Sequence, residues 1–119
     1  MLIRLFNAEE STAILFDTGG SPNDMEKNAK IMGLEIGEIE LIVLSHGHYD
    51  HFGGLLSVIK ATGKKDLPII VHEDMFRSRG TTSHVGTIRE YPKFSNLAQL
   101  ASAKQILTKQ PYLFAHDHI

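Results

Sequence analysis

Residues 41–54, LIVLSHGHYDHFGG, decide the fold of this chain. Four uninterrupted apolar residues, 41–44, indicate a strand that is covered on both faces, as in a layered α/β domain. Gly53 and Gly54 then open an expected helix, whose buried side comes from apolar residues within 55–59. Potential metal ligands fill the turn between strand and helix: His46, His48, Asp50 and His51. Ligands usually bind at the carboxyl ends of strands in α/β proteins, so this turn is the candidate functional site.

The spacing of these four residues has a physical meaning. In an extended segment His46 and His48 project to the same side, so their imidazoles can share one cation. Asp50 and His51 follow a bend and can reach a second cation nearby. Imidazole with carboxylate suits zinc, and also iron or manganese. The alternative, a surface loop that is rich in histidine by chance, is disfavoured by the strand-to-helix context.

Upstream of the motif, the chain predicts two strands and a helix. Residues 2–6 and 12–16 are short β-prone runs, joined by a polar loop of hairpin length. Ser21 and Pro22 are typical of a helix start, and Gly33 is placed to end that helix. Its inward face is expected to carry Met25, Ala29 and Met32.

Downstream, residues 68–71 predict another strand that ends at His72. Ser95 is expected to cap a third helix with Leu97, Leu100 and Ala101 facing inward, and residues 106–108 and 112–114 to form late strands. Residues 81–91 are either a long loop or an irregular hairpin. The order of strands and helices favours an α/β layer architecture.

Composition restricts the classes of function. The chain has 119 residues, which suggests one compact unit, and it has no cysteine, so any metal must be held by His, Asp or Glu. A net charge of −2 gives no electrostatic footprint for nucleic acid. Neither a signal peptide nor a membrane-length apolar run is present in the sequence, so we expect a cytoplasmic protein with a small-molecule substrate.

These residues resemble the metallo-β-lactamase superfamily. The matching parts are residues 14–19, 42–45, the motif SHGHYDH at 45–51, and 53–55. The resemblance implies that His46 and His48 bind one metal ion, that Asp50 and His51 bind the second, and that the cofactor is one or two Zn²⁺ ions, with iron or manganese as alternatives. Asp17 matches an aspartate at a strand end that steadies the metal loop.

The resemblance also implies a function. Histidine at position 48 favours the hydrolase branches over the oxygen-reducing diiron branch, which commonly has glutamate there. The expected activity is metal-dependent hydrolysis, in which a metal-bound hydroxide attacks an ester, amide or phosphoester-type bond. Asp50 is the one residue assigned a catalytic role, that of orienting the water. The motif region resembles most a branch that includes proteins associated with pterin biosynthesis in methanogens.

The length of the chain departs from the family pattern. The family domain is about twice as long and pairs two similar halves, so the expected fold is the N-terminal half of an αββα sandwich, a mixed sheet with helices. Residues 1–119 then form a partial domain whose second half is absent, and each metal receives two ligands. The chain is a fragment, a subunit completed by a second copy or another chain, or a degenerate remnant, in that order of preference. The alternative function is a non-catalytic metal-binding subunit, whereas an RNA nuclease is disfavoured by the net charge.

The remaining polar residues carry weaker expectations. His72 is expected to pack or hydrogen-bond, and His84 to be exposed. His116, Asp117 and His118 could complete a metal site in another chain but favour a turn. Surface positions are expected for three arginines: Arg77, Arg79 and Arg89. Core positions are expected for five apolar residues, Leu2, Leu5, Phe6, Phe94 and Phe114, and an uncovered apolar sheet face is expected to drive association.

Overall fold

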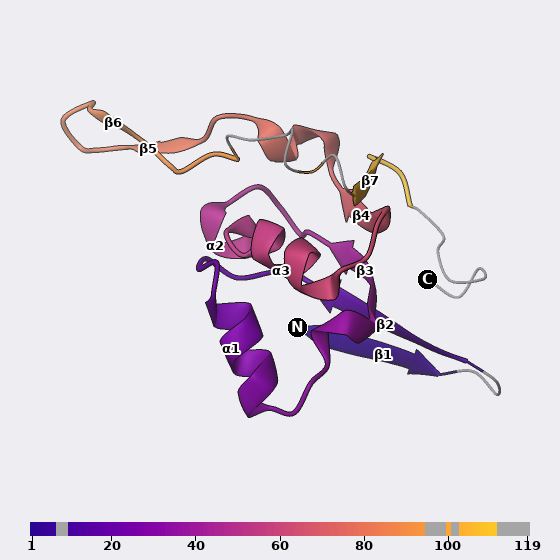
Figure 1. Ribbon diagram of the computed structural model, residues 1–119. Coiled ribbons are helices and arrows are strands. Elements are labelled where there is room, and N and C mark those ends of the chain that lie inside the picture. Colours follow the sequence, from indigo (N-terminus) through magenta and orange to yellow (C-terminus); the bar gives the residue numbers. More distant parts are fainter. Residues whose placement is uncertain (7–9, 95–99, 101–102, 112–119) are drawn as a thin grey trace.

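The computed structural model describes residues 1–6, 10–94, 100 and 103–111. A five-stranded mixed sheet with the order β1-β2-β3-β4-β7 forms the centre of the molecule (Figure 1). Strand β1 (Leu2–Phe6) runs antiparallel to β2 (Ser11–Phe16). Strands β3 (Ile39–Val43), β4 (Leu67–Val71) and β7 (Ala103–Leu107) continue the sheet parallel to β2. The α/β architecture expected from the sequence is confirmed.

Helices α1 (Asp24–Ile31) and α3 (Leu55–Thr62) pack against one face of this sheet. The core lies between them and the strands, because apolar side chains of α3 meet those of β2, β3 and β4. Its most buried members are Leu15, Ile42, Leu55, Leu67, Ile69, Leu100 and Val58. Leu55, Val58 and Ile59 of α3 are buried as expected, whereas Leu56, also expected on the buried side, is only partly buried.

The opposite face of the sheet is apolar as well. It forms a groove of about 340 Å³ lined mainly by Ile3, Leu5, Ile14, Phe16, Leu41, Val43 and Ile70. The expectation of an apolar sheet face away from the helices is therefore met. Leu5 belongs to this groove rather than to the core, Leu2 and Phe94 pack against the core, and Phe6 is exposed. Phe114 lies outside the described residues.

Shorter elements connect the layers. Two 3₁₀ turns, η1 (Ile36–Glu38) and η2 (Glu73–Phe76), precede β3 and follow β4. A short helix, α2 (Tyr49–Phe52), overlaps the ligand motif, which is residues 45–51. Strands β5 (Gly80–Thr82) and β6 (Ile88–Glu90) form an exposed two-stranded ribbon that extends away from the sheet (Figure 1). Residues 81–91 are thus an irregular hairpin, one of the two forms expected.

Two predictions about the first helix are wrong, and a predicted third helix lies mostly outside the described residues. Helix α1 begins at Asp24 rather than at Ser21, and Asn23 before it makes no side-chain cap. Met32 is exposed because α1 ends at Ile31, where Gly33 takes a φ of +66° and turns the chain away. Of the expected helix after Ser95 only Leu100 is described, as a buried residue, and residues 112–114 lie outside the described part. Among the helices that the structure describes, none has the length and apolar character that crossing a membrane requires.

Candidate metal centre

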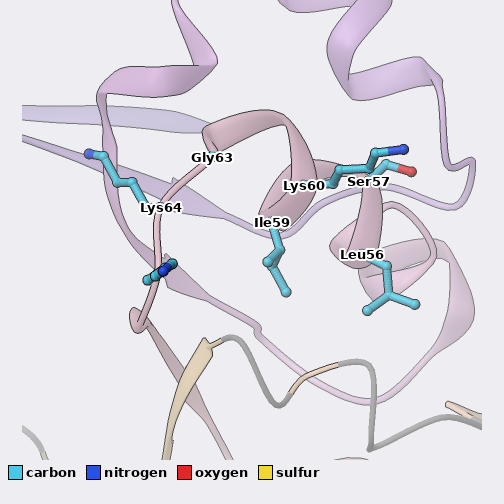
Figure 2. A pocket seen from close by; sticks show the side chains of 7 residues that line it. Leu56, Ser57, Ile59, Lys60, Gly63 and Lys64 are labelled. Atoms are coloured by element: carbon cyan, nitrogen blue, oxygen red, sulfur yellow. The ribbon is translucent and has the colours of Figure 1, made fainter.

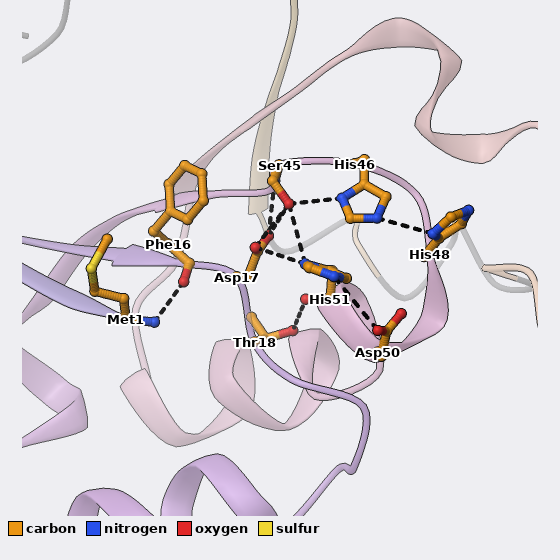
Figure 3. Close-up of polar contacts among 9 residues, drawn as sticks. All are labelled: Met1, Phe16, Asp17, Thr18, Ser45, His46, His48, Asp50 and His51. Atoms are coloured by element: carbon orange, nitrogen blue, oxygen red, sulfur yellow. Dashed lines mark hydrogen bonds and ion pairs between the residues drawn. The ribbon is translucent and has the colours of Figure 1, made fainter.

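The ligand motif begins where β3 leaves the sheet. After Leu44 the chain bends at Ser45 and again at Gly47, and it is extended at His48, whose φ of −87° and ψ of 146° precede the first residue of α2. His46 Nε2 and His48 Nδ1 share a hydrogen bond of 3.0 Å in the metal-free chain (Figure 3). Bonds of 2.0–2.1 Å to a tetrahedral zinc would separate two ligand nitrogens by roughly 3.3 Å. The bent turn therefore brings these two imidazoles to a spacing close to that of two ligands of one shared cation.

The second pair of candidate ligands lies on α2. His51 Nε2 is 3.6 Å from Asp50 Oδ2, and the ring centroids of His46 and His51 are 4.0 Å apart, so the two pairs adjoin. Asp50 is largely exposed. Within the part of the chain that the structure describes, no group of three or more His, Asp or Glu side chains is arranged to hold a metal ion. The site is therefore two adjoining pairs, and the role of these four residues as ligands stays a prediction.

Asp17 holds the motif from the end of β2. Its Oδ2 lies 2.8 Å from His51 Nδ1, and its Oδ1 accepts a hydrogen bond of 2.8 Å from the backbone N–H of Ser45. The Ser45 hydroxyl also donates to this carboxylate. When the imidazole is neutral, donation from His51 Nδ1 to Asp17 leaves the lone pair on Nε2, the ring nitrogen that lies toward Asp50 (Figure 3), and this is the form that a metal ligand needs.

Two pKa values depart from their ordinary range in this network. Burial opposes ionisation of Asp17, but hydrogen bonds from His51 and Ser45 outweigh it and lower the pKa of the Asp17 carboxyl. Burial, followed by repulsion from His51 and His48, lowers the pKa of His46. Asp17 is thus held as an anion and His46 as a neutral imidazole, and neutral imidazole is the form that binds cations.

Asp17→Asn is expected to lower the free energy of unfolding by about 2 kcal/mol at pH 7, because hydrogen bonds to a charged acceptor are lost. Asparagine also tolerates the φ of +60° at this position, so backbone strain does not confound the comparison. Since the folded-state pKa of Asp17 is lowered, its stabilisation is present above the unfolded value and is lost as pH falls through the folded value. Urea unfolding of both proteins at pH 7 and at pH 3 checks this. A difference that is equally large at both pH values would contradict it.

The loop after β2 also fixes α2 and α3. Both the backbone N–H and the hydroxyl of buried Thr18 donate to the carbonyl of His51, at 2.8 and 3.0 Å. The N–H of Gly54 donates to the carbonyl of Gly19 at 3.0 Å. Thr18 was not singled out from the sequence, because nothing in its local pattern indicates a partner 33 residues later.

Arg79 and Tyr91 also reach the motif from the segment after β4. The Arg79 guanidinium donates to the carbonyl of Gly47 at 3.3 Å, and the Tyr91 ring meets the His48 ring edge-on at a centroid distance of 5.7 Å. Arg79 was expected on the surface but is partly buried, whereas Arg77 and Arg89 are exposed as expected. The motif carries no local signal for either contact.

Two further histidines that the structure describes, His72 and His84, lie outside this cluster. His72 is exposed, and its Nδ1 accepts a hydrogen bond of 3.1 Å from the N–H of Asp74 at the start of η2, as a hydrogen-bonded strand end should. His84 is exposed in the β5–β6 hairpin, as expected. His116, Asp117 and His118 lie outside the described residues. A groove of about 530 Å³ runs along α3 toward Lys64 and Lys65 (Figure 2), but it shares no residue with the ligand motif.

Comparison with known proteins places this geometry in a family. The sequence pattern described as the metallo-beta-lactamase superfamily matches residues 1–118. The 7,8-dihydropterin-6-methyl-4-(beta-D-ribofuranosyl)-aminobenzene-5'-phosphate synthase of Methanocaldococcus jannaschii is 38% identical over 64 residues, which are 54% of this chain and 21% of that protein. An uncharacterized protein of the same organism is 32% identical over 110 residues, 89% of this chain and 40% of its own length.

Solved structures agree. Rm3 metallo-beta-lactamase superimposes with a TM-score of 0.57 at 21% identity, over 96% of this chain and 40% of the enzyme. A quorum-quenching N-acyl homoserine lactone lactonase superimposes with a TM-score of 0.52 at 26% identity, over 87% of this chain and 42% of the lactonase. The chain thus spans less than half the length of the relatives it matches, and its mixed sheet with helices on one face corresponds to part of their fold. On this sequence pattern and this fold, the chain belongs to the metallo-β-lactamase superfamily.

Proposed function

We propose that this chain supplies half of the active site of a metal-dependent hydrolase, in which His46 and His48 hold one zinc-type cation and Asp50 and His51 hold a second. The observation that carries the proposal is the opposed pair of ring nitrogens on His46 and His48, 3.0 Å apart at the end of a buried strand. The Asp17 carboxylate supports it, because it sets the tautomer in which His51 can bind a metal.

The reaction proposed is hydrolysis of an ester, amide or phosphoester-type bond in a small molecule. When bound, a divalent cation of this kind acts as a Lewis acid and lowers the pKa of water toward neutrality. From this chain, the exposed Asp50 carboxylate is the group available to orient a water molecule by accepting its hydrogen bond. The lactonase relative makes a lactone a reasonable first substrate to assay.

The remaining ligands must come from outside the described residues. A catalytic zinc ordinarily has three protein ligands, whereas each pair here offers two. The relatives are more than twice as long as the parts that match this chain. A further stretch of a longer protein, a second copy or another chain would supply the missing groups.

His48→Ala tests the proposal. We expect the affinity of the purified chain for Co²⁺ or Zn²⁺ to fall at least tenfold, because one of two neighbouring imidazole ligands is lost. The matched control is His84→Ala, which removes an exposed histidine of the β5–β6 hairpin and should leave metal affinity unchanged. Calorimetric titration measures both. Equal affinities in wild type and His48→Ala would refute the assignment of His48.

A second function has its own support, namely a non-catalytic subunit that binds metal and pairs with a partner chain. The apolar groove on the helix-free sheet face favours it, since a surface of this kind is usually covered. Lactone turnover by the metal-loaded chain, followed together with its mass in solution, separates the two. Metal binding without turnover in a chain that associates would favour the subunit.

A further inference from the structure

We propose that Arg79 is a positioning residue, which fixes the backbone of residues 46–48 and thereby the spacing of the two imidazoles. The importance of this spacing for metal binding rests on the proposed function. We call the contacts of Arg79 with Gly47 and with the turn after β4 the clamp. They lie within this chain and can be tested without metal.

The Arg79 guanidinium is bonded to backbone carbonyls. Its Nη2 donates to the carbonyl of Asp74 at 2.6 Å, and its Nη1 donates to the carbonyls of Met75 and Arg77 at 2.8 and 3.0 Å. The same Nη1 lies 3.3 Å from the carbonyl of Gly47, between the two histidines. No ion pair of Arg79 occurs among the described residues. The cation therefore joins the turn after β4 to the ligand loop after β3.

A side chain would not fit at position 47, because Arg79 and η2 occupy the space beside Gly47. A Cβ built on buried Gly47 would lie 2.1 Å from the carbonyl oxygen of Met75 and 2.4 Å from Arg79 Nη1. Real Cβ atoms essentially never approach so closely, so the loop and the guanidinium are in direct contact. The position of Gly47, and with it the separation of His46 from His48, depends on this packing.

The backbone of Arg79 also positions Tyr91, whose ring contacts His48. Its carbonyl accepts a hydrogen bond of 2.9 Å from the N–H of Tyr91, at the end of the β5–β6 hairpin. The Tyr91 ring then stands edge-on to the His48 ring, at 5.7 Å and an interplanar angle of 80°. Arg79 thus contacts the loop of residues 46–48 through its side chain, and through its main chain it holds the Tyr91 ring beside His48.

The chemistry explains why arginine occupies this position. A planar guanidinium presents five N–H donors in a rigid fork and can serve several carbonyls at once, whereas an ammonium is a compact point charge on a flexible stem. Without it, the carbonyl of Met75 loses the guanidinium donor, the carbonyl of Asp74 keeps only the N–H of Arg77, and the Gly47 peptide loses the contact that restrains it. Groups that orient metal ligands in this way typically change metal affinity by 10–100-fold when removed.

Arg79→Met is the test, with Arg89→Met as the matched control, because Arg89 is exposed on β6. Titration with Co²⁺, followed by the visible absorption of the bound ion, should show affinity at least tenfold weaker and an altered spectrum for Arg79→Met. Arg89→Met should match wild type. Arg79→Lys should recover only part of the affinity, since it restores the charge but not the fork. Unchanged affinity and spectrum in folded Arg79→Met, or in Arg79→Lys where the methionine variant does not fold, would overturn the proposal.

Amide hydrogen exchange in the metal-free chain separates this proposal from the proposed function. The amides of His51 and Phe52, which donate to the carbonyl of His48, should exchange faster in Arg79→Met than in wild type and in Arg89→Met. If wild type binds no cobalt but this acceleration is seen, the hydrolase proposal fails and the clamp stands. Unaccelerated exchange at these two amides would overturn the clamp whatever the metal result.

Discussion

Gly54→Ala is expected to lower the free energy of unfolding by about 3–5 kcal/mol, among the largest effects of any single substitution in this chain. A Cβ at Gly54 would lie 2.5 Å from the carbonyl oxygen of Thr18 and 3.1 Å from that of Ser21. Both neighbours are backbone atoms and cannot rotate away as a side chain would. The Gly54 angles, φ −87° and ψ −3°, suit any residue, so the cost comes from contact alone.

The consequence reaches the candidate site. The loop that an alanine would displace carries Asp17, which bonds His51, and Thr18, which bonds the His51 carbonyl. Urea unfolding measures the loss of stability, and Gly37→Ala is the matched control, because a Cβ at Gly37 meets nothing within 4 Å. If both alanine variants unfold at the same urea concentration, the close packing of Gly54 against the Thr18 loop is not important for stability.

Ile42→Ala is the second substitution with a large expected effect. Ile42 is 0% exposed and sits in β3, between Leu15 of β2 and Ile69 of β4. Truncating a buried isoleucine to alanine removes apolar contacts and leaves a cavity, which costs about 2–5 kcal/mol. For a chain of this size, that corresponds to a fall in melting temperature of roughly 10–25 °C.

Thermal unfolding followed by circular dichroism checks this, with Ile31→Ala as the control. Ile31 ends α1 and is 74% exposed, so the same chemical change there should shift the melting temperature by only a few degrees. The comparison bears on function because β3 leads directly into the ligand loop. A small shift for Ile42→Ala would mean that the sheet core is not packed as described.

The sequence predicted the parts of the fold that depend on local pattern. Six strands were expected, of which five, at residues 2–6, 12–16, 41–44, 68–71 and 106–108, overlap strands of the sheet, while the sixth, at 112–114, lies outside the described residues. The glycine pair at 53–54 correctly placed the start of α3, because apolar residues follow it at helical spacing. The start of α1 was predicted less well, since Ser21 and Pro22 resemble a helix start while the helix begins three residues after Ser21.

Long-range contacts could not be predicted from a single sequence. Arg79 reaches Gly47 across 32 residues, and Tyr91 meets His48 from the far end of a hairpin whose residues show neither clear strand nor clear helix periodicity. Side-chain identity alone did not distinguish Arg79 from the exposed Arg77 and Arg89. What distinguishes Arg79 is the packing of η2 against the ligand motif, which brings its guanidinium to Gly47.

By itself, the sequence determined the α/β class, the family, and the turn that carries His46, His48, Asp50 and His51, because these follow from residue type and spacing along a short segment. The tertiary structure decided how that turn is held: by the Asp17 carboxylate from β2, by the Thr18 loop beneath α2, and by the Arg79 guanidinium after η2. The physical reason is that hydrogen bonds and steric contacts act over a few ångströms. Residues far apart in the chain acquire them only once the sheet has brought their strand ends together.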